Sequence, residues 1–334
     1  MSIIPVIKEV GRGAAGARSL SRELARITMG QVLDGEVSEI ELGALLIALR
    51  MKGETLDELM GFLDAVQARC AMLDSDSPVV LIPSYNGARR LCNFTPLLAM
   101  SLAQEGARVL VHGNLSDPVR TTSAAVFHDL GLPAAHHLDD VQQAWARHEP
   151  AFVGTALLCP ALQTLLDRRW QLGVRNAGHT VAKMLNPVRG TRALRLVNFT
   201  HPEFGELMRA WAQRDRADAL LLRGTEGEPA ADPRRMPRVD TYIEGQWHAS
   251  ASAAAHDGVL AVMPLLPRSN DAASTALYVQ SVIGGERPAP APLARQVQLI
   301  LNALSAMTGS SGDMGNDMGG SMGSKTGSPM DSSA

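Results

Sequence analysis

The 334-residue chain is poor in cysteine, aromatic side chains and net charge, and it has no long apolar run. Its three cysteines, Cys70, Cys92 and Cys159, lie far apart and form no CxxC pair, which argues against a disulfide framework or a zinc site. No stretch approaches the ~20 apolar residues that a membrane helix requires. Residues 1–9 are too short and too soon charged for a signal peptide. We therefore expect a soluble, cytoplasmic protein with reduced thiols.

The low net charge and the few aromatic residues also limit the partners. A formal charge of −3 gives no overall sign of nucleic-acid binding, although a binding face needs only a local excess of cations. Aromatic residues make up 4% of the chain, so platforms for stacking bases are not evident.

Several catalytic motifs are missing as well. The chain has no GxSxG, HExxH or Walker loop, which disfavours the hydrolase, zincin and P-loop classes. Residues 11–16 resemble a dinucleotide fingerprint only superficially, because no strand precedes them. The run His136–Asp140 has the residue types of metal ligands, but its aspartates can cap the helix expected after it. We therefore predict no metal site.

Two patterns divide the chain. Up to about residue 72, leucines recur at helical spacing, and residues 38–41 fit a capping box. From about residue 78, apolar runs alternate with helical segments, which predicts a sheet covered by helices. The expected strands are 79–82, 108–111, 151–154, 194–197, 219–222 and 258–262, and the expected helices of this part are 93–103, 122–130, 138–148 and 161–184.

The end of the chain has a different composition. Residues 309–334 are rich in Gly, Ser, Met and Asp and have no periodicity. Such a segment cannot bury enough apolar surface to offset its chain entropy, so we expect a disordered tail.

The stretch from Val79 to Asn114 is the most informative. An apolar run leads into a polar turn, a helical run follows, and a second apolar run ends on His112-Gly113-Asn114. Strand, loop, helix and strand form a βαβ unit, in which backbone N–H groups at the helix N-terminus can bind an anion. The stretch predicts a phosphate-binding arrangement.

Several segments recur in the order of known family signatures. The chain resembles the anthranilate phosphoribosyltransferase family, which has the glycosyltransferase family 3 fold, over roughly residues 5–305. It is most similar to the YbiB branch, which keeps the fold and is known for binding nucleic acid. The segments that carry the resemblance are residues 36–55, VHGN at 111–114, LGVRN at 172–176, LNP at 185–187, IPSYNGAR at 82–89 and LRGTEGE at 222–228.

Departures from the family affect the phosphate loop most. Enzymes of the family have a glycine-rich GTGGD loop whose bare backbone wraps a pyrophosphate. This chain has Pro83-Ser84-Tyr85-Asn86-Gly87 instead, and proline and bulky side chains restrict such a grip. The basic residues that flank HGN in the family are replaced by Val111 and Leu115.

The magnesium ligands of the family are also altered. The resemblance places its adjacent Asp-Glu pair at Pro229 and Ala230, which have no carboxylate. Glu226 and Glu228 can substitute only if the loop shifts by a residue or two. We therefore expect no cofactor, with magnesium required only if the chain is an active enzyme.

Some positions of the substrate site are retained. As implied by the resemblance, a vestigial cleft for phosphate and substrate comprises Ser84, Asn86, Gly87, Asn93, Thr95, His112, Gly113, Asn114 and Arg175. For Asn93 and Thr95 the alternative is simple helix capping, and for Arg175 it is a solvated or ion-paired arginine.

Local charge is uneven. Residues 1–33 have a net charge of +3, residues 165–200 have +6, and residues 34–64 have −6. Arg18, Arg22 and Arg26 line one face if their segment is one helix, and Arg168, Arg175 and Lys183 stack similarly along a helix over about 161–185. This pattern fits a phosphate-backbone track or, alternatively, ordinary solvated faces. The proposed nucleic-acid contacts are Lys8, Arg12, Arg18, Arg22, Arg26, Arg168, Arg169, Arg175 and Lys183.

Together these patterns predict a small helical domain, residues 1–72, joined in space by the helix 161–185. A larger α/β domain, residues 73–308, has a mixed, mainly parallel sheet of the phosphoribosyltransferase type. The resemblance implies a homodimer through the helical domains. The leading hypothesis is a catalytically degenerate protein that binds DNA or RNA non-specifically through its phosphate backbone. The alternative is an active phosphoribosyltransferase.

Overall fold

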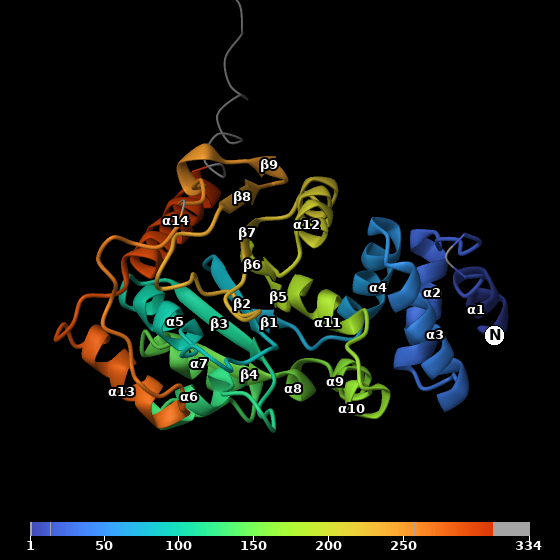
Figure 1. The fold of residues 1–334 in the computed structure, drawn as a ribbon, viewed down its shortest axis with the longest axis horizontal. Helices are drawn as coiled ribbons and strands as arrows, with labels where there is room; N and C mark the ends of the chain where they lie inside the picture. Colours follow the sequence, from blue (N-terminus) through green and yellow to red (C-terminus); the bar gives the residue numbers. More distant parts are fainter. Residues whose placement is uncertain (1, 14, 257, 310–334) are drawn as a thin grey trace, which may run out of the picture.

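The computed structural model describes residues 2–13, 15–256 and 258–309. A helical bundle lies beside a larger α/β domain, and the chain passes from the bundle to this domain after α4 (Figure 1). The predicted tail, 309–334, lies outside the described residues except for Gly309, which ends the last helix.

The bundle contains four helices, and a serine or threonine side chain caps the N-terminus of three of them. They are α1 Ile4–Val10, α2 Arg22–Leu33, α3 Glu39–Lys52 and α4 Leu56–Gln67. The Ser38 side chain accepts a hydrogen bond from the Glu41 amide, and the Glu41 side chain accepts one from the Ser38 amide, so the predicted capping box is confirmed. Thr55 and Glu58 form a second box at α4, and Ser21 caps α2.

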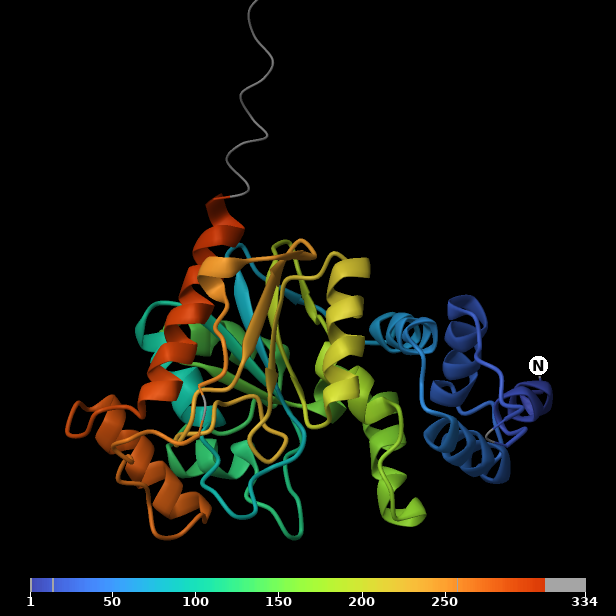
Figure 2. The same cartoon turned by 45° about the horizontal axis from the view of Figure 1, so that its top comes forward.

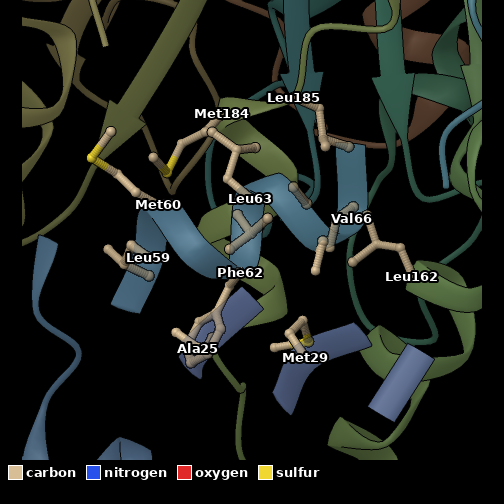
Figure 3. Packing of buried hydrophobic residues seen from close by; sticks show 14 of the residues in the cluster. Ala25, Met29, Leu59, Met60, Phe62, Leu63, Val66, Leu162, Met184 and Leu185 are labelled. Atoms are coloured by element: carbon tan, nitrogen blue, oxygen red, sulfur yellow. The ribbon is translucent and has the colours of Figure 1, made fainter. Parts of the chain in front are cut away.

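Helices α2 and α4 are in backbone contact. A Cβ at Gly61 would lie 2.2 Å from the carbonyl oxygen of Arg22, so only glycine permits this approach. Phe62 points from α4 toward Ala25 of α2 (Figure 3). On the other side of α4 the same apolar cluster contains Leu162 and Met184. The core of the bundle therefore continues into a later segment of the chain.

That later segment is not the single helix predicted over 161–185. It consists of α9 Pro160–Asp167, α10 Arg169–Leu172, α11 Gly178–Val181 and the 3₁₀ turn η1 Ala182–Met184. Gly173 adopts a left-handed conformation, φ +73°, and ends α10. Because the backbone turns here, Arg168, Arg175 and Lys183 do not share a helix face, and this part of the prediction was wrong.

A seven-stranded sheet forms the centre of the α/β domain, in the order β4-β3-β2-β6-β7-β8-β9. The first five strands are parallel and the last two antiparallel, which confirms the mixed, mainly parallel sheet. Their bounds are β2 Val79–Ser84, β3 Arg108–Gly113, β4 Ala151–Gly154, β6 Ala193–Phe199, β7 Ala219–Arg223, β8 Val239–Ile243 and β9 Gln246–Trp247. A separate parallel pair joins β1 Leu73–Asp74 to β5 Val188–Arg189.

Helices cover the sheet, and α12 lies next to the bundle (Figures 1 and 2). An ion pair of 2.6 Å between Arg214 of α12 and Asp57 of α4 bridges the two parts. The helices are α5 Thr95–Gln104, α6 Ser123–Asp129, α7 Leu138–Ala146, α8 Thr155–Leu158, α12 Pro202–Arg214, α13 Ala272–Ile283 and α14 Ala291–Gly309, with a 3₁₀ turn, η2, at Ala249–Ala251.

One expected strand is absent, and four strands of the described residues were not expected: β1, β5, β8 and β9. Residues 258–262 form no strand. The strand after β7 is β8, whose sequence VDTYI reads as polar because Asp240 interrupts it. Asp240 is nevertheless buried, and ion pairs with Arg209 at 2.9 Å and Arg238 at 3.0 Å compensate its charge.

Among the described residues, no helix has the combination of length and apolar character that crossing a membrane requires.

Candidate functional site

A cleft of about 900 Å³ opens where the bundle meets the carboxyl ends of the sheet strands. Its walls come from the end of α3, the β2–α5 loop, α11 and η1, the end of β6, the start of α12, and residues 226–227. This volume lies in the range of small-molecule sites, and the position is the usual ligand position in open α/β sheets. Six cationic side chains line it: Arg50, Arg89, Arg90, Arg120, Arg175 and Lys183.

The predicted phosphate loop, residues 83–87, begins at the end of β2 and continues into the β2–α5 loop, residues 85–94, which we call the phosphate loop. A carboxylate of the protein lies against this loop. Oε1 of Glu228 accepts hydrogen bonds from the Asn86 amide at 2.8 Å and the Gly87 amide at 2.6 Å. Its Oε2 accepts one from the Thr95 hydroxyl at 3.2 Å. Glu228 is 2% exposed, and burial raises its pKa, while the hydrogen bonds oppose that shift.

A second carboxylate occupies the following residues of the same loop. Glu226 accepts hydrogen bonds from the amides of Arg89 and Arg90. Both Glu226 and Gly227 adopt left-handed backbone conformations, φ +53° and +88°. This tight turn also brings the Gly227 carbonyl to the side-chain amides of Asn86 and Asn198. Backbone groups placed to bind an anion are thus already paired with the chain's own acids.

Tyr85 is a bulky residue in a loop that is rich in glycine in the enzymes of the resembled family. Its side chain is 1% exposed, and its hydroxyl lies 2.9 Å from Nδ1 of His112, which is equally buried. Burial lowers the pKa of His112 to about 4, so this imidazole is neutral at physiological pH. The side chains of Tyr85 and His112 therefore form a buried, uncharged pair at the base of the phosphate loop.

Most of the predicted vestigial cleft is structural. Ser84 Oγ donates to Ser123 Oγ at 2.7 Å, and Asn114 Nδ2 donates to the Tyr85 carbonyl at 2.9 Å. Asn93 Oδ1 accepts from the Thr95 amide at 3.2 Å at the start of α5. Gly113 is needed because a Cβ there would meet the Ser84 carbonyl oxygen. Among the predicted set, only Asn86 and Arg175 line the large cleft.

Arg175 and Lys183 are partly buried cations beside the cleft. The guanidinium of Arg175 makes no ion pair in the described part of the chain, and burial, with the charges of Arg169 and Arg120, lowers its pKa to about 10. Burial lowers the pKa of Lys183 to about 8, with Arg175 acting in the same direction. Lys183 Nζ donates to the Asn198 carbonyl at 3.3 Å. Both side chains would gain favourable electrostatic energy from an anion in the cleft.

The predicted basic residues of the bundle lie elsewhere and are paired with acids. Residues 15–21 are not helical, so Arg18 does not share a helix with Arg22 and Arg26, contrary to the prediction. Lys8 is exposed on α1. The acid partners are Glu9 for Arg12 at 2.6 Å and Arg18 at 3.9 Å, Asp64 for Arg22 at 2.6 Å, and Glu23 for Arg26 at 2.7 Å.

Two further predicted cations are also paired. Arg168 contacts Glu39 of α3 at 2.7 Å. Arg169 contacts Asp117 at 3.0 Å, and its guanidinium lies 4.1 Å from the ring centroid of Trp170. The structure therefore separates the predicted set, and of its members only Arg175 and Lys183 reach the cleft.

The sequence prediction missed the apolar wall and four of the six cationic side chains of the cleft. Phe199 ends β6 and Phe204 lies in the first turn of α12, and both line the cleft beside the buried Met208. An aromatic residue on each side of a helix start was the available signal. The missed cations, Arg50, Arg89, Arg90 and Arg120, lay inside or near recognised segments but come together only in space.

The donor set does not fit magnesium. Pro229 and Ala230 stand where the acidic pair was expected, and both oxygens of Glu228 are already hydrogen-bonded. In the ranges that the structure describes, no group of three or more His, Cys, Asp or Glu side chains is arranged to hold a metal.

The sequence is similar to those of known proteins over most of its length. Residues 4–70 match the family model described as "Glycosyl transferase family, helical bundle domain". The chain is 37% identical over 311 residues to the uncharacterised protein YbiB of Escherichia coli strain K12, which covers 92% of this chain and 96% of that protein. It is 27% identical over 304 residues to anthranilate phosphoribosyltransferase of Myxococcus xanthus, which covers 90% and 88%.

Solved structures share the fold. Anthranilate phosphoribosyltransferase of Thermus thermophilus superposes with a TM-score of 0.68 at 23% identity, over 91% of this chain and 89% of that chain. The enzyme of Saccharomyces cerevisiae, solved in complex with PRPP and Mg, gives 0.65 at 13% identity, over 92% and 88%.

Proposed function

The chain belongs to the anthranilate phosphoribosyltransferase-like family of glycosyl transferases, and from this premise we propose that it is a non-specific nucleic-acid-binding protein without transferase activity. The observation that supports this most strongly is the pairing of Glu226 and Glu228 with the backbone amides of the phosphate loop. An entering pyrophosphate would have to displace two carboxylates from those amides and would meet their negative charge.

The substituted residues under the loop support the same conclusion. Tyr85 occupies the space beside His112, and the donor set does not fit magnesium. A pyrophosphate donor would therefore lack both the backbone grip and the cation that neutralises it.

The cleft itself keeps a strong positive charge. Six cationic side chains line it against the acids Glu54, Glu203 and Glu226. The Glu226 carboxylate bonds to amides of the loop, and burial raises the pKa of Glu54. We propose that these cations contact the phosphates of DNA or RNA, with affinity that is largely sequence-independent.

We also propose a homodimer through the helical domains. Helix α3 exposes Ile40, Ala44, Ile47 and Met51 at a spacing that places them on one stripe. Ile40 is 86% and Met51 80% exposed, an apolar face that a second copy can cover. Sedimentation of the protein and of Ile47→Glu tests this: a dimer is expected for the former and a monomer for the latter.

The experiment that tests the function combines binding with catalysis. Fluorescence anisotropy of labelled single and double strands is measured over a salt series, and pyrophosphate release is measured with PRPP, magnesium and anthranilate. We expect salt-sensitive binding, with a log–log slope of about −0.9 per phosphate contacted on duplex DNA and about −0.7 on single strands. We expect no transfer. Turnover that depends on magnesium would overturn the proposal, as would absence of binding at low salt.

A further inference from the structure

The cleft has two chemically different parts. The β2–α5 loop, α11 and η1 contribute cations, including Arg89, Arg90, Arg175 and Lys183. The end of β6 and the start of α12 contribute apolar and aromatic side chains, with Phe199 and Phe204 partly exposed. A simple polyanion track would need only the first part. The second part calls for a ligand with a flat apolar group next to its phosphate.

The cationic part has an excess of positive charge, because six cationic side chains line the cleft against the acids Glu54, Glu203 and Glu226. Arg89 and Arg90 are exposed, and their side chains make no ion pair with a described residue. The carboxylates of Glu226 and Glu228 bond to backbone amides of this loop. Arg175 likewise has no carboxylate partner within the described residues. A phosphate monoester, which carries close to two negative charges at neutral pH, matches this excess better than an internal diester with one.

The aromatic part can stack a base. Each of the four bases can stack on an aromatic side chain, so such stacking agrees with non-specific binding. On the same wall Asn198 is 3% exposed, and its Oδ1 has no hydrogen-bond partner among the described atoms. An unpaired buried acceptor costs stability, so a donor group from a sugar or base would be favourable there.

We propose that the cleft binds one unpaired, terminal nucleotide that carries a phosphate monoester, with the phosphate against Arg89, Arg90 and Arg175 and the base against Phe199 and Phe204. This rests on the proposed function when the nucleotide is a strand end, whereas a free mononucleotide has the same chemistry. A base pair is excluded because the base must leave its stack to reach the aromatic wall.

Anisotropy with a short single strand tests the terminal phosphate. The strand is prepared with a 5′-phosphate, with a 3′-phosphate and with hydroxyls at both ends, and the duplex serves as a further ligand. We expect a terminal phosphate to raise affinity roughly tenfold at one end. A nucleoside monophosphate is expected to compete, whereas ribose 5-phosphate and inorganic phosphate compete much less because they lack a base.

Variants of the two parts separate their contributions. Phe204→Leu keeps apolar volume but removes the aromatic face, and we expect it to reduce affinity for the phosphorylated strand about tenfold. Arg175→Gln is expected to abolish the preference for a terminal phosphate. The matched controls are Leu277→Ala, an exposed apolar site on α13, and Arg216→Gln, which lies beyond the far end of α12. Thermal unfolding of each variant checks that the fold is intact.

The outcomes distinguish this inference from the proposed function. Salt-sensitive strand binding that ignores the terminal phosphate, the mononucleotide and Phe204 overturns the inference and leaves the function standing. Mononucleotide binding without strand binding supports the cleft site and overturns the function. Binding of neither ligand overturns both.

Discussion

The arginines of the bundle and those of the cleft differ in which of their groups a neighbouring acid contacts, the guanidinium or the backbone amide. In the bundle, carboxylates contact the guanidinium groups: Arg22 makes two hydrogen bonds to Asp64, and Arg26 makes two to Glu23. In the cleft, Glu226 contacts the backbone amides of Arg89 and Arg90, and both arginines are exposed and make no ion pair with a described residue. Acids and bases are close together in both regions, but only in the cleft are the cationic side chains available.

This difference shows why local net charge does not identify a binding surface. Residues 1–33 and 165–200 are both basic in sequence, yet most of their arginines are paired with acids from distant segments. An ion pair at the surface contributes little energy, but it reduces the local potential that attracts a polyanion. The relevant quantity is the charge left after side-chain pairing, and that requires the fold.

The most direct way to break the comparison is to reverse charges in both regions. Arg89→Glu with Arg90→Glu is expected to weaken nucleic-acid binding on the order of a hundredfold at low salt, or about 2.8 kcal/mol, because two phosphate contacts become repulsive. The backbone amides that bond Glu226 remain. Anisotropy over a salt series measures the affinity and the slope.

The matched change in the bundle is Arg12→Glu with Arg18→Glu. Here Glu9 already offsets the charge, so we expect less than about a threefold change in affinity. An equal loss in both double variants would show that side-chain pairing does not decide which arginines bind.

The second prediction concerns the acid that closes the phosphate loop. Glu228→Ala leaves the amides of Asn86 and Gly87 without an acceptor, and we expect it to lower the free energy of unfolding by about 2 kcal/mol. Glu228→Gln keeps an acceptor oxygen and should retain most of the stability. Urea unfolding measures both, and an Ala variant as stable as the Gln variant would exclude a structural role for these bonds.

The raised pKa of Glu228 adds a pH signature to the same experiment. The folded state holds this proton at pH values at which the unfolded state has released it. Stability from this group is therefore lost as pH rises from about 4.5, the ordinary glutamate value, through the raised pKa. Glu228→Gln should remove that decline.

A smaller effect on stability distinguishes the paired arginines of the bundle from one another. Arg22→Gln breaks a bidentate contact between α2 and α4 and is expected to cost about 1 kcal/mol with binding unchanged. Arg26→Gln removes an exposed pair within one helix and should cost less than about 0.5 kcal/mol. Thermal unfolding and anisotropy on both variants provide the check, and a loss of affinity in Arg22→Gln would return α2 to the binding surface.

Much of the fold could be predicted from local patterns. The strand 151–154 and the runs within β2, β3 and β7 are continuous apolar segments, which parallel, fully covered strands require. The run within β6 is apolar except for Arg195. The capping box at Ser38 is a pattern of neighbouring residues. Residues 258–262 were apolar enough for a strand but have no pairing partner, whereas β8 contains Asp240, whose charge is compensated only by distant arginines.

The candidate site was less predictable because its parts meet through tertiary structure. Glu228 could be considered a substitute metal ligand from its position, but nothing local indicated that it would bond to the Asn86 and Gly87 amides. The cations from α3 and the β2–α5 loop are far apart in the sequence and converge only at the cleft. Predicted cleft residues such as Ser84 proved to be hydrogen-bonded inside the wall, because a sequence motif does not show which partner its side chains contact.

The smallest expected effect separates Lys183 from the arginines that share its cleft. Because burial lowers its pKa to about 8, Lys183 is mostly charged at pH 7 and mostly neutral at pH 9, whereas arginines remain charged throughout. If Lys183 contacts phosphate, nucleic-acid affinity should fall by about threefold across this interval, since one favourable charge disappears. Lys183→Arg should remove the pH dependence while keeping the affinity at pH 7.

A bound phosphate favours the charged form of Lys183, so the midpoint of the fall should lie above the pKa of Lys183 in the free protein. The complex should therefore take up protons near pH 8, which calorimetry in buffers of different ionisation enthalpy can detect. The same fall in Lys183→Arg would assign the titration to another group and leave the arginines as the only phosphate ligands of the cleft.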